Sequence, residues 1–121
     1  MAITGTHVLL YSSEPEKLRA VLKDVFGWKH VDAGEGWLIF RLPPSELGVH
    51  PAEGGALHAP QHQFTLMCDD IHATIKEVAG KGVTIKGEPQ DQGWGIVVDL
   101  VLPGDLTVML YQPRHPVALD L

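Results

Sequence analysis

Two stretches of the chain carry apolar residues at every third or fourth position, which predicts two amphipathic helices. The first helix begins after Ser13, which precedes Glu16 at the spacing of a capping box, and it ends at Gly27. The second begins at Asp69 or Asp70 and ends at two closely spaced glycines. The buried faces are predicted to be Leu18, Val21, Leu22, Val25 and Phe26 in the first helix, and Ile71, Ile75, Val78 and Ala79 in the second.

Short apolar or alternating runs predict the strands, and they occur in the same order on both sides of a central segment. Residues 8–13 are typical of a strand that leads into the first helix, and residues 64–69 repeat that pattern before the second. Each helix is followed by a short strand, a Gly-rich turn with a Gly-Trp pair, and two further strands. The pattern therefore predicts an internal duplication of a βαβββ unit.

The two units are predicted to form a single α+β domain over residues 1–121. Residues 4–51 form module one and residues 62–113 form module two, while the glycines and small residues of 52–61 are typical of a linker. One helix covers only one face of each module's sheet. We therefore expect the tandem βαβββ modules to form a curved mixed sheet whose bare faces meet around a cup.

Alternation along the strands predicts which side chains face the cup, because neighbouring residues point to opposite faces of a sheet. Apolar positions are assigned to the helix side, which leaves the more polar positions for the cup. Two criteria give different directions for His50. The alternation of apolar residues along its strand, which we call apolar parity, places His50 on the cup side. The alignment of His50-Pro51 with Gln112-Pro113 places it on the opposite side, unless a bulge shifts the register. The predicted lining is His7, Tyr11, Arg41, Glu46, His50, Gln63, Thr65, Asp99, Met109 and Tyr111, with Trp94 at the rim.

Composition and charge narrow the classes of partner. The chain has 121 residues, of which 45% are apolar and 20% are charged, and this balance suffices for one folded core. The formal net charge of −6 disfavours nucleic acid and anionic membrane surfaces. The single cysteine, Cys68, suits a reducing compartment and a buried thiol, and no leader-like or membrane-spanning run is visible. We expect a cytoplasmic protein with a small-molecule ligand and with neither a nucleic-acid nor a membrane partner.

The paired βαβββ units resemble the vicinal oxygen chelate superfamily. The resemblance also rests on His7 at the start of the first strand and on the D-D-I-x-A-T-x-x-x-x-x-x-K-G-V run over residues 69–83, and it spans nearly the whole chain. That superfamily includes glyoxalase I, extradiol dioxygenases, fosfomycin-resistance transferases and bleomycin-binding proteins. The resemblance implies the glyoxalase/bleomycin resistance/dihydroxybiphenyl dioxygenase fold and, together with the open strand edges of small modules, a homodimer. Its enzymes hold a divalent metal in the cup as a Lewis acid.

The metal-ligand positions of that superfamily are only partly retained. His7 occupies the first-strand position and is of the right type, whereas the matching position of the second half carries Gln63 and the last-strand carboxylate position carries Met109. A thioether does not replace a carboxylate on a hard divalent ion. We therefore name no metal ligands and leave the cofactor unknown, with a divalent ion on a reduced set that includes Glu46 or His50 still open.

Two functional hypotheses follow from the predicted cup. In the first, the protein binds a small oxygen-rich or aromatic molecule as an enzyme with lyase, isomerase or dioxygenase-like chemistry, and His7 and His50 polarise the substrate or move a proton on it. In the second, it is a metal-free sequestering protein of the bleomycin-resistance type, with aromatic side chains stacked on a planar ligand. The predicted ligand contacts are Tyr11, Arg41, Gln63, Trp94, Asp99, Met109 and Tyr111.

Overall fold

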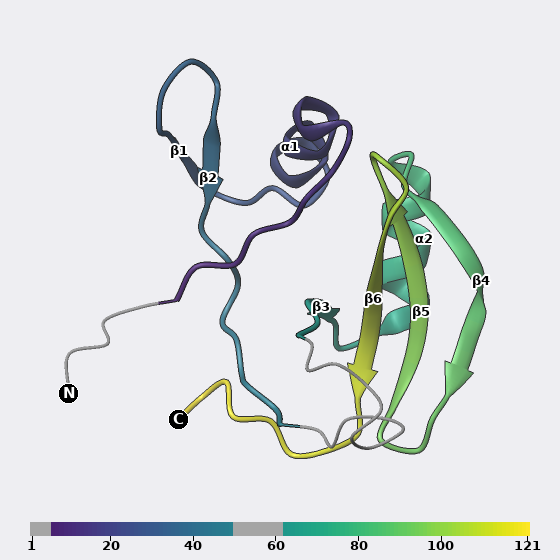
Figure 1. Ribbon diagram of the computed structural model, residues 1–121. Helices are drawn as coiled ribbons and strands as arrows, with labels where there is room; N and C mark the ends of the chain where they lie inside the picture. Colours follow the sequence, from purple (N-terminus) through teal and green to yellow (C-terminus); the bar gives the residue numbers. More distant parts are fainter. Residues whose placement is uncertain (1–5, 50–61) are drawn as a thin grey trace, which may run out of the picture.

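The computed structural model describes residues 6–49 and 62–121, which form a mixed α+β structure with two helices and a curved mixed sheet (Figure 1). The first half contributes one helix and a two-stranded hairpin, and the second half contributes the other helix and a four-stranded sheet. The elements are α1 (Pro15–Asp24), β1 (His30–Asp32), β2 (Leu38–Phe40), β3 (Thr65–Met67), α2 (Ile71–Gly80), β4 (Thr84–Asp91), β5 (Gly95–Leu102) and β6 (Leu106–Pro113).

The second half forms the βαβββ unit that the pattern predicts. Its strand order is β3-β6-β5-β4, with β3 parallel to β6 and the other pairs antiparallel. Alternate residues of β5, namely Val98, Leu100 and Leu102, are buried, as the apolar parity predicts. They join Ile71 and Val78 of α2 in the core. The sheet is therefore stabilised by apolar packing on its helix-covered face.

Helix α2 begins and ends at the predicted residues. Asp70 is its N-cap, and the side chain accepts a hydrogen bond from the backbone N–H of Ala73 at 3.1 Å. After the helix the chain reverses through Gly82, whose φ of +94° lies in the region that only glycine adopts without strain.

Helix α1 begins differently from the prediction. Its N-cap is Glu14, and no side chain caps it, so the predicted Ser13–Glu16 capping box is wrong. The neighbouring polar groups instead connect the two halves of the chain. The Ser12 hydroxyl donates to the carbonyl of Pro103 at 2.7 Å, and Glu14 Oε2 accepts from the N–H of Gly104 at 3.0 Å.

The first half lacks two of its predicted strands within the described residues. Residues 6–13 form no strand, and neither do residues 41–49, although the N–H of Arg41 donates to the carbonyl of Lys29 at 2.8 Å beside the hairpin of β1 and β2. The predicted strand over residues 8–13 is therefore wrong for this structure. Alternation makes a segment suitable for a sheet, but a strand also needs a paired neighbour to satisfy its backbone groups.

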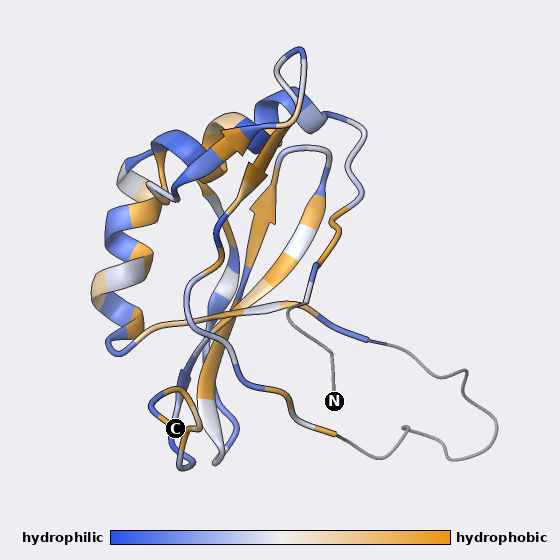
Figure 2. Cartoon of the chain, turned by 90° about the vertical axis from the view of Figure 1, so that its left-hand side faces the viewer, coloured by the Kyte–Doolittle hydropathy of each residue, from blue (hydrophilic) through white to orange (hydrophobic). Residues whose placement is uncertain are grey.

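Both halves nevertheless contribute to one core. Leu18 and Leu22 of α1 are buried in the same cluster as the apolar residues of α2 and the sheet. In Figure 2 several strands carry long orange stretches, whereas the helices alternate between blue and orange as amphipathic helices do. Neither helix in the described ranges combines the length and apolar character needed to cross a membrane.

Candidate functional site

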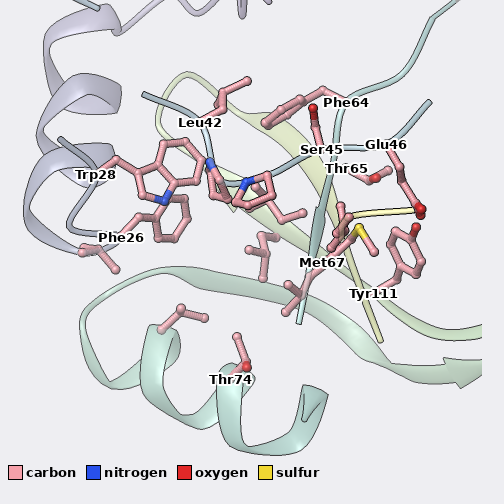
Figure 3. A pocket seen from close by; sticks show the side chains of 18 of the residues that line it. Phe26, Trp28, Leu42, Ser45, Glu46, Phe64, Thr65, Met67, Thr74 and Tyr111 are labelled. Carbon is pink, nitrogen blue, oxygen red and sulfur yellow. The ribbon is translucent and has the colours of Figure 1, made fainter. Parts of the chain in front are cut away.

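A cavity of about 420 Å³ lies where the two halves meet (Figure 3). We call it the aromatic cavity. Residues 25–28, which follow α1, and residues 42–46 border it on one side, and β3, β6 and α2 border it on the other. Its lining residues are Val25, Phe26, Trp28, Leu42, Pro43, Pro44, Ser45, Glu46, Phe64, Thr65, Leu66, Met67, Thr74, Glu77, Val78, Leu100, Leu110, Tyr111 and Leu119.

Aromatic side chains form one end of this cavity. The rings of Phe26 and Trp28 have centroids 5.3 Å apart at a tilt of 44°, and Phe64 reaches toward the same space from the start of β3 (Figure 3). Gly27 separates the two rings, and its φ of +69° lets the chain leave the helix there without steric strain. The wall thus provides flat apolar surfaces on which a planar molecule can stack.

Polar groups gather at the opposite end. Glu46 and Tyr111 lie beside each other there, with Thr65 nearby, whereas Ser45 lies beside Phe64 (Figure 3). Burial raises the pKa of the Tyr111 hydroxyl above its ordinary value, and the negative charge of Glu46 and a hydrogen bond to it raise this pKa further. Tyr111 therefore keeps its proton at neutral pH and serves as a neutral hydrogen-bonding group.

A second cavity, of about 540 Å³, is lined mainly by residues of the first half, together with Phe64. We call it the basic cavity, because its described lining includes His7, Arg19 and Arg41 but no carboxylate. The guanidinium of Arg19 sits 4.7 Å from the ring centroid of Trp37, a cation–π contact that stabilises both side chains. The remaining walls come from residues 6–12, from α1, from β2 and from residues that also line the aromatic cavity, namely Trp28, Leu42, Pro43, Pro44, Ser45 and Phe64.

The predicted lining residues do not share one cavity in the single chain. Glu46, Thr65 and Tyr111 line the aromatic cavity, whereas His7 and Arg41 line the basic cavity. The prediction of a single shared polar pocket is therefore wrong here. It assumed that the first module forms a full sheet facing the second, and the first half forms only the short β1–β2 hairpin.

The other predicted residues lie outside both cavities. Asp99 and Met109 are paired in register on neighbouring strands, on the sheet face opposite the buried Val98 and Leu100. Tyr11 is 82% exposed, Gln63 is also exposed, and Trp94 packs edge-on against Tyr111 at 5.6 Å while remaining half exposed. His50 lies outside the described residues. The roles of all these residues toward a ligand stay predictions.

The described residues do not fit the metal site of the superfamily's enzymes. Within residues 6–49 and 62–121, no group of three or more His, Cys, Asp and Glu side chains is arranged to hold a metal ion. His7 and Glu46, the described candidates for two corners, line different cavities. Gln63 is exposed, and Met109 supplies only a thioether.

Cys68 is a half-buried thiol next to the entry of α2. Its Sγ contacts the carbonyl oxygen of Tyr111 at 3.6 Å and donates to it. Burial raises the pKa of this thiol, and the charges of Asp69 and Asp70 raise it further, while a hydrogen bond with Thr74 acts in the opposite direction. The thiol is thus held in its unreactive protonated form.

Sequence reasoning missed the aromatic wall of the cavity, because Phe26 and Phe64 were assigned to the helix-packed core. One signal was available: the Phe26-Gly27-Trp28 run at the end of the first helix. A glycine with positive φ between two aromatic residues turns the backbone, so that the second ring points in a new direction. This local turn brings Trp28 next to Phe26 at the cavity.

The comparisons place this fold among known proteins. The model of the Glyoxalase/Bleomycin resistance protein/Dioxygenase superfamily matches residues 6–103. Similar solved structures include TnmS3, an antibiotic binding protein from Streptomyces sp. CB03234, with 21% identity, a TM-score of 0.66, and coverage of 94% of this chain and 99% of that one.

Two further structures share the fold. Lactoylglutathione lyase from Agrobacterium tumefaciens has 17% identity, a TM-score of 0.63, and coverage of 91% of this chain and 93% of that one. The fosfomycin resistance protein FosX from Listeria monocytogenes has 14% identity, a TM-score of 0.60, and coverage of 94% of each chain. No curated protein sequence matches the chain. The family match over most of the chain shows that this protein belongs to the Glyoxalase/Bleomycin resistance protein/Dioxygenase superfamily.

Proposed function

We propose that this protein binds a small, planar, largely aromatic molecule in the aromatic cavity. The observation that carries the proposal is the pairing of Phe26 and Trp28 at one end of a cavity of about 420 Å³ with polar groups at the other. Ligand pockets commonly enclose about 300–1,000 Å³ and combine apolar walls with a few polar groups that orient the ligand. The cavity has this size and this composition.

Binding rests mainly on burial of the ligand's ring surface. Each Å² of apolar surface removed from water contributes about 25 cal/mol, and a well-placed aromatic contact adds about 0.5–1.5 kcal/mol. Phe26, Trp28 and Phe64 supply the ring contacts. The polar end then selects the ligand's orientation, because an unpaired polar group inside a cavity is costly.

A sequestering role is favoured over catalysis at His7 and His50. His7 is exposed and lines the basic cavity but not the aromatic cavity. The antibiotic binding protein TnmS3 has the same fold, which supports a binding role without identifying a ligand. Glyoxalase-like or dioxygenase-like activity stays a prediction, whose test is turnover that is lost in His7→Ala and His50→Ala.

The test is calorimetric titration with 2-naphthol, a two-ring planar molecule. We expect saturable one-to-one binding that Phe64→Leu weakens by about tenfold, since one ring contact is worth roughly 1 kcal/mol or slightly more. Val31→Ala is the matched control, because Val31 is 65% exposed and lines neither cavity. Absence of saturable binding, or equal affinity in the Phe64 variant, would contradict the proposal.

We also propose that the chain forms a homodimer. Support comes from the segments 6–13 and 41–49, which form no strand and leave Leu9, Leu47 and Val49 largely exposed. Light scattering at micromolar concentration should give twice the chain mass. The double variant Leu47→Lys, Val49→Lys should become monomeric, whereas Leu121→Lys, at an exposed leucine of the C-terminus, should not. A monomeric parent protein would overturn the dimer.

A further inference from the structure

The charge inside the aromatic cavity comes from carboxylates alone. Its described lining includes Glu46 and Glu77 but no Lys, Arg or His. Glu77 has a side chain that is 66% exposed and lies 3.4 Å from the Lys81 ammonium, so its charge is neutralised and screened by solvent. The side chain of Glu46 is only 17% exposed. Glu46 therefore dominates the electrostatics of the polar end.

The two carboxylate oxygens of Glu46 differ in their surroundings. Oε2 accepts a hydrogen bond from the backbone N–H of Ala118 at 2.8 Å, which anchors the carboxylate. Oε1 lies 4.0 Å from Nε2 of His115, beyond hydrogen-bond distance. The hydrogen bond to Oε2 fixes the position of the whole carboxylate. Oε1 is therefore held in place and can still accept a hydrogen bond.

His115 lies next to the Tyr111 hydroxyl and offers it an acceptor. The ring nitrogen Nδ1 lies 2.8 Å from the carbonyl oxygen of Pro116, and a carbonyl only accepts, so Nδ1 carries the proton of the neutral ring. Nε2 is then an acceptor, 3.5 Å from the Tyr111 hydroxyl. The hydroxyl proton of Tyr111 thus has two acceptors in the protein, the Glu46 carboxylate and Nε2 of His115, and its oxygen lone pairs remain for a ligand.

Resting on the proposed function, we propose that the aromatic cavity selects planar ligands that carry a hydrogen-bond donor at one end, a protonated amine above all, and rejects carboxylates. Glu46 Oε1 and the Tyr111 oxygen would accept the donor, and Glu46 would attract a positive charge. A ligand carboxylate would meet the Glu46 carboxylate at close range without any cation of the cavity to compensate it. This class of ligand is opposite to the one that the arginines of the basic cavity favour.

The test is a series of ligands with one ring system and different head groups, each titrated calorimetrically. The ligands are 2-naphthylmethylamine, 2-naphthol, 2-methoxynaphthalene and 2-naphthoate. We expect affinity to fall in that order, with the amine about tenfold tighter than the methoxy compound, because hydrogen bonds to charged groups are stronger than neutral ones. The naphthoate should bind most weakly.

Glu46→Gln isolates the charge, because glutamine retains an oxygen that can accept from Ala118 and has almost the same shape. This variant should lose the preference for the amine over the methoxy compound while retaining affinity for the methoxy compound. Glu77→Gln is the matched control: it removes the other carboxylate of the cavity and should leave the preference unchanged. Tyr111→Phe should reduce the affinity for 2-naphthol more than that for 2-methoxynaphthalene.

The outcomes separate this inference from the proposed function. If no ligand of the series binds, the proposed function fails. If all four bind with similar affinity, if naphthoate binds best, or if Glu46→Gln retains the amine preference, the cavity binds rings without the proposed head-group selection. In each of these last three cases the inference is overturned while the ring-binding function stands.

Discussion

The two halves of the chain repeat one sequence pattern but differ in how completely they fold around it. In the second half, β5 and β6 pair over eight residues in uninterrupted register, whereas β1 and β2 of the first half pair over three. Most of the buried core belongs to the second half, to which the first adds Leu18 and Leu22. Repetition of a pattern therefore specifies the kind of element, while its extent depends on the neighbour with which it pairs.

The largest expected difference between the halves is in core stability. Ile71→Ala removes a side chain that is 0% exposed and should lower the free energy of unfolding by about 2–5 kcal/mol. Val31→Ala, at a 65% exposed position of β1, should change it by less than about 0.5 kcal/mol. Urea unfolding followed by circular dichroism measures both. Similar losses would mean that the first half is packed as tightly as the second.

The contact between the halves gives the second prediction. Gly104 has a φ of +86°, and a Cβ there would collide with the Ser12 hydroxyl, which donates to Pro103. We expect Gly104→Ala to cost about 2 kcal/mol, of which roughly half is backbone strain. Gly87→Ala is the control, because its φ of +77° imposes the same strain while its Cβ would meet nothing within 4 Å. Equal costs would show that the Ser12 contact contributes nothing.

Much of the second half was predictable from sequence, and the reasons are local. Asp70 caps α2 as expected, and alternation correctly assigned Leu100 to the helix-covered face. Ser13 carries an equally good capping signal, yet the adjacent Ser12 and Glu14 bond to the turn after β5. Hydrogen bonds to a distant turn thus form here in place of a local side-chain cap. The sequence around a helix start does not reveal such a distant partner.

The candidate site was predictable only in part. Parity correctly placed Asp99 and Met109 on one face of the sheet, and Glu46, Thr65 and Tyr111 line a common cavity. The aromatic wall depends on how the residues after α1 and the residue before β3 come together at one cavity, which neither helical nor strand periodicity encodes. A residue on an apolar face looks the same in sequence whether it faces a filled core or a cavity.

The caps of the two helices provide the third prediction. Asp70→Ala removes the side-chain acceptor for the N–H of Ala73 and should cost about 1 kcal/mol of stability. Ser13→Ala, at the matching place in the first half, should cost close to nothing, because Ser13 does not cap α1. Thermal unfolding monitored by calorimetry compares the two. A loss at Ser13 as large as that at Asp70 would restore the capping box.

The smallest effect is expected at Cys68, which the repeat aligns with Ser12. Because burial raises the pKa of the Cys68 thiol, the folded protein holds this proton more tightly than the unfolded chain does. This contribution to stability is therefore constant below the thiol's ordinary pKa and decreases as the pH rises through the folded value.

The same shift predicts slow alkylation of Cys68 by iodoacetamide at pH 8, with a rate that keeps increasing above pH 9. In a Cys68→Ser background, Ser13→Cys places a thiol at the exposed helix entry of the first half and should react faster at pH 8. If both thiols react equally fast at pH 8, the two helix entries do not differ in burial, and the contrast between the halves fails at this position.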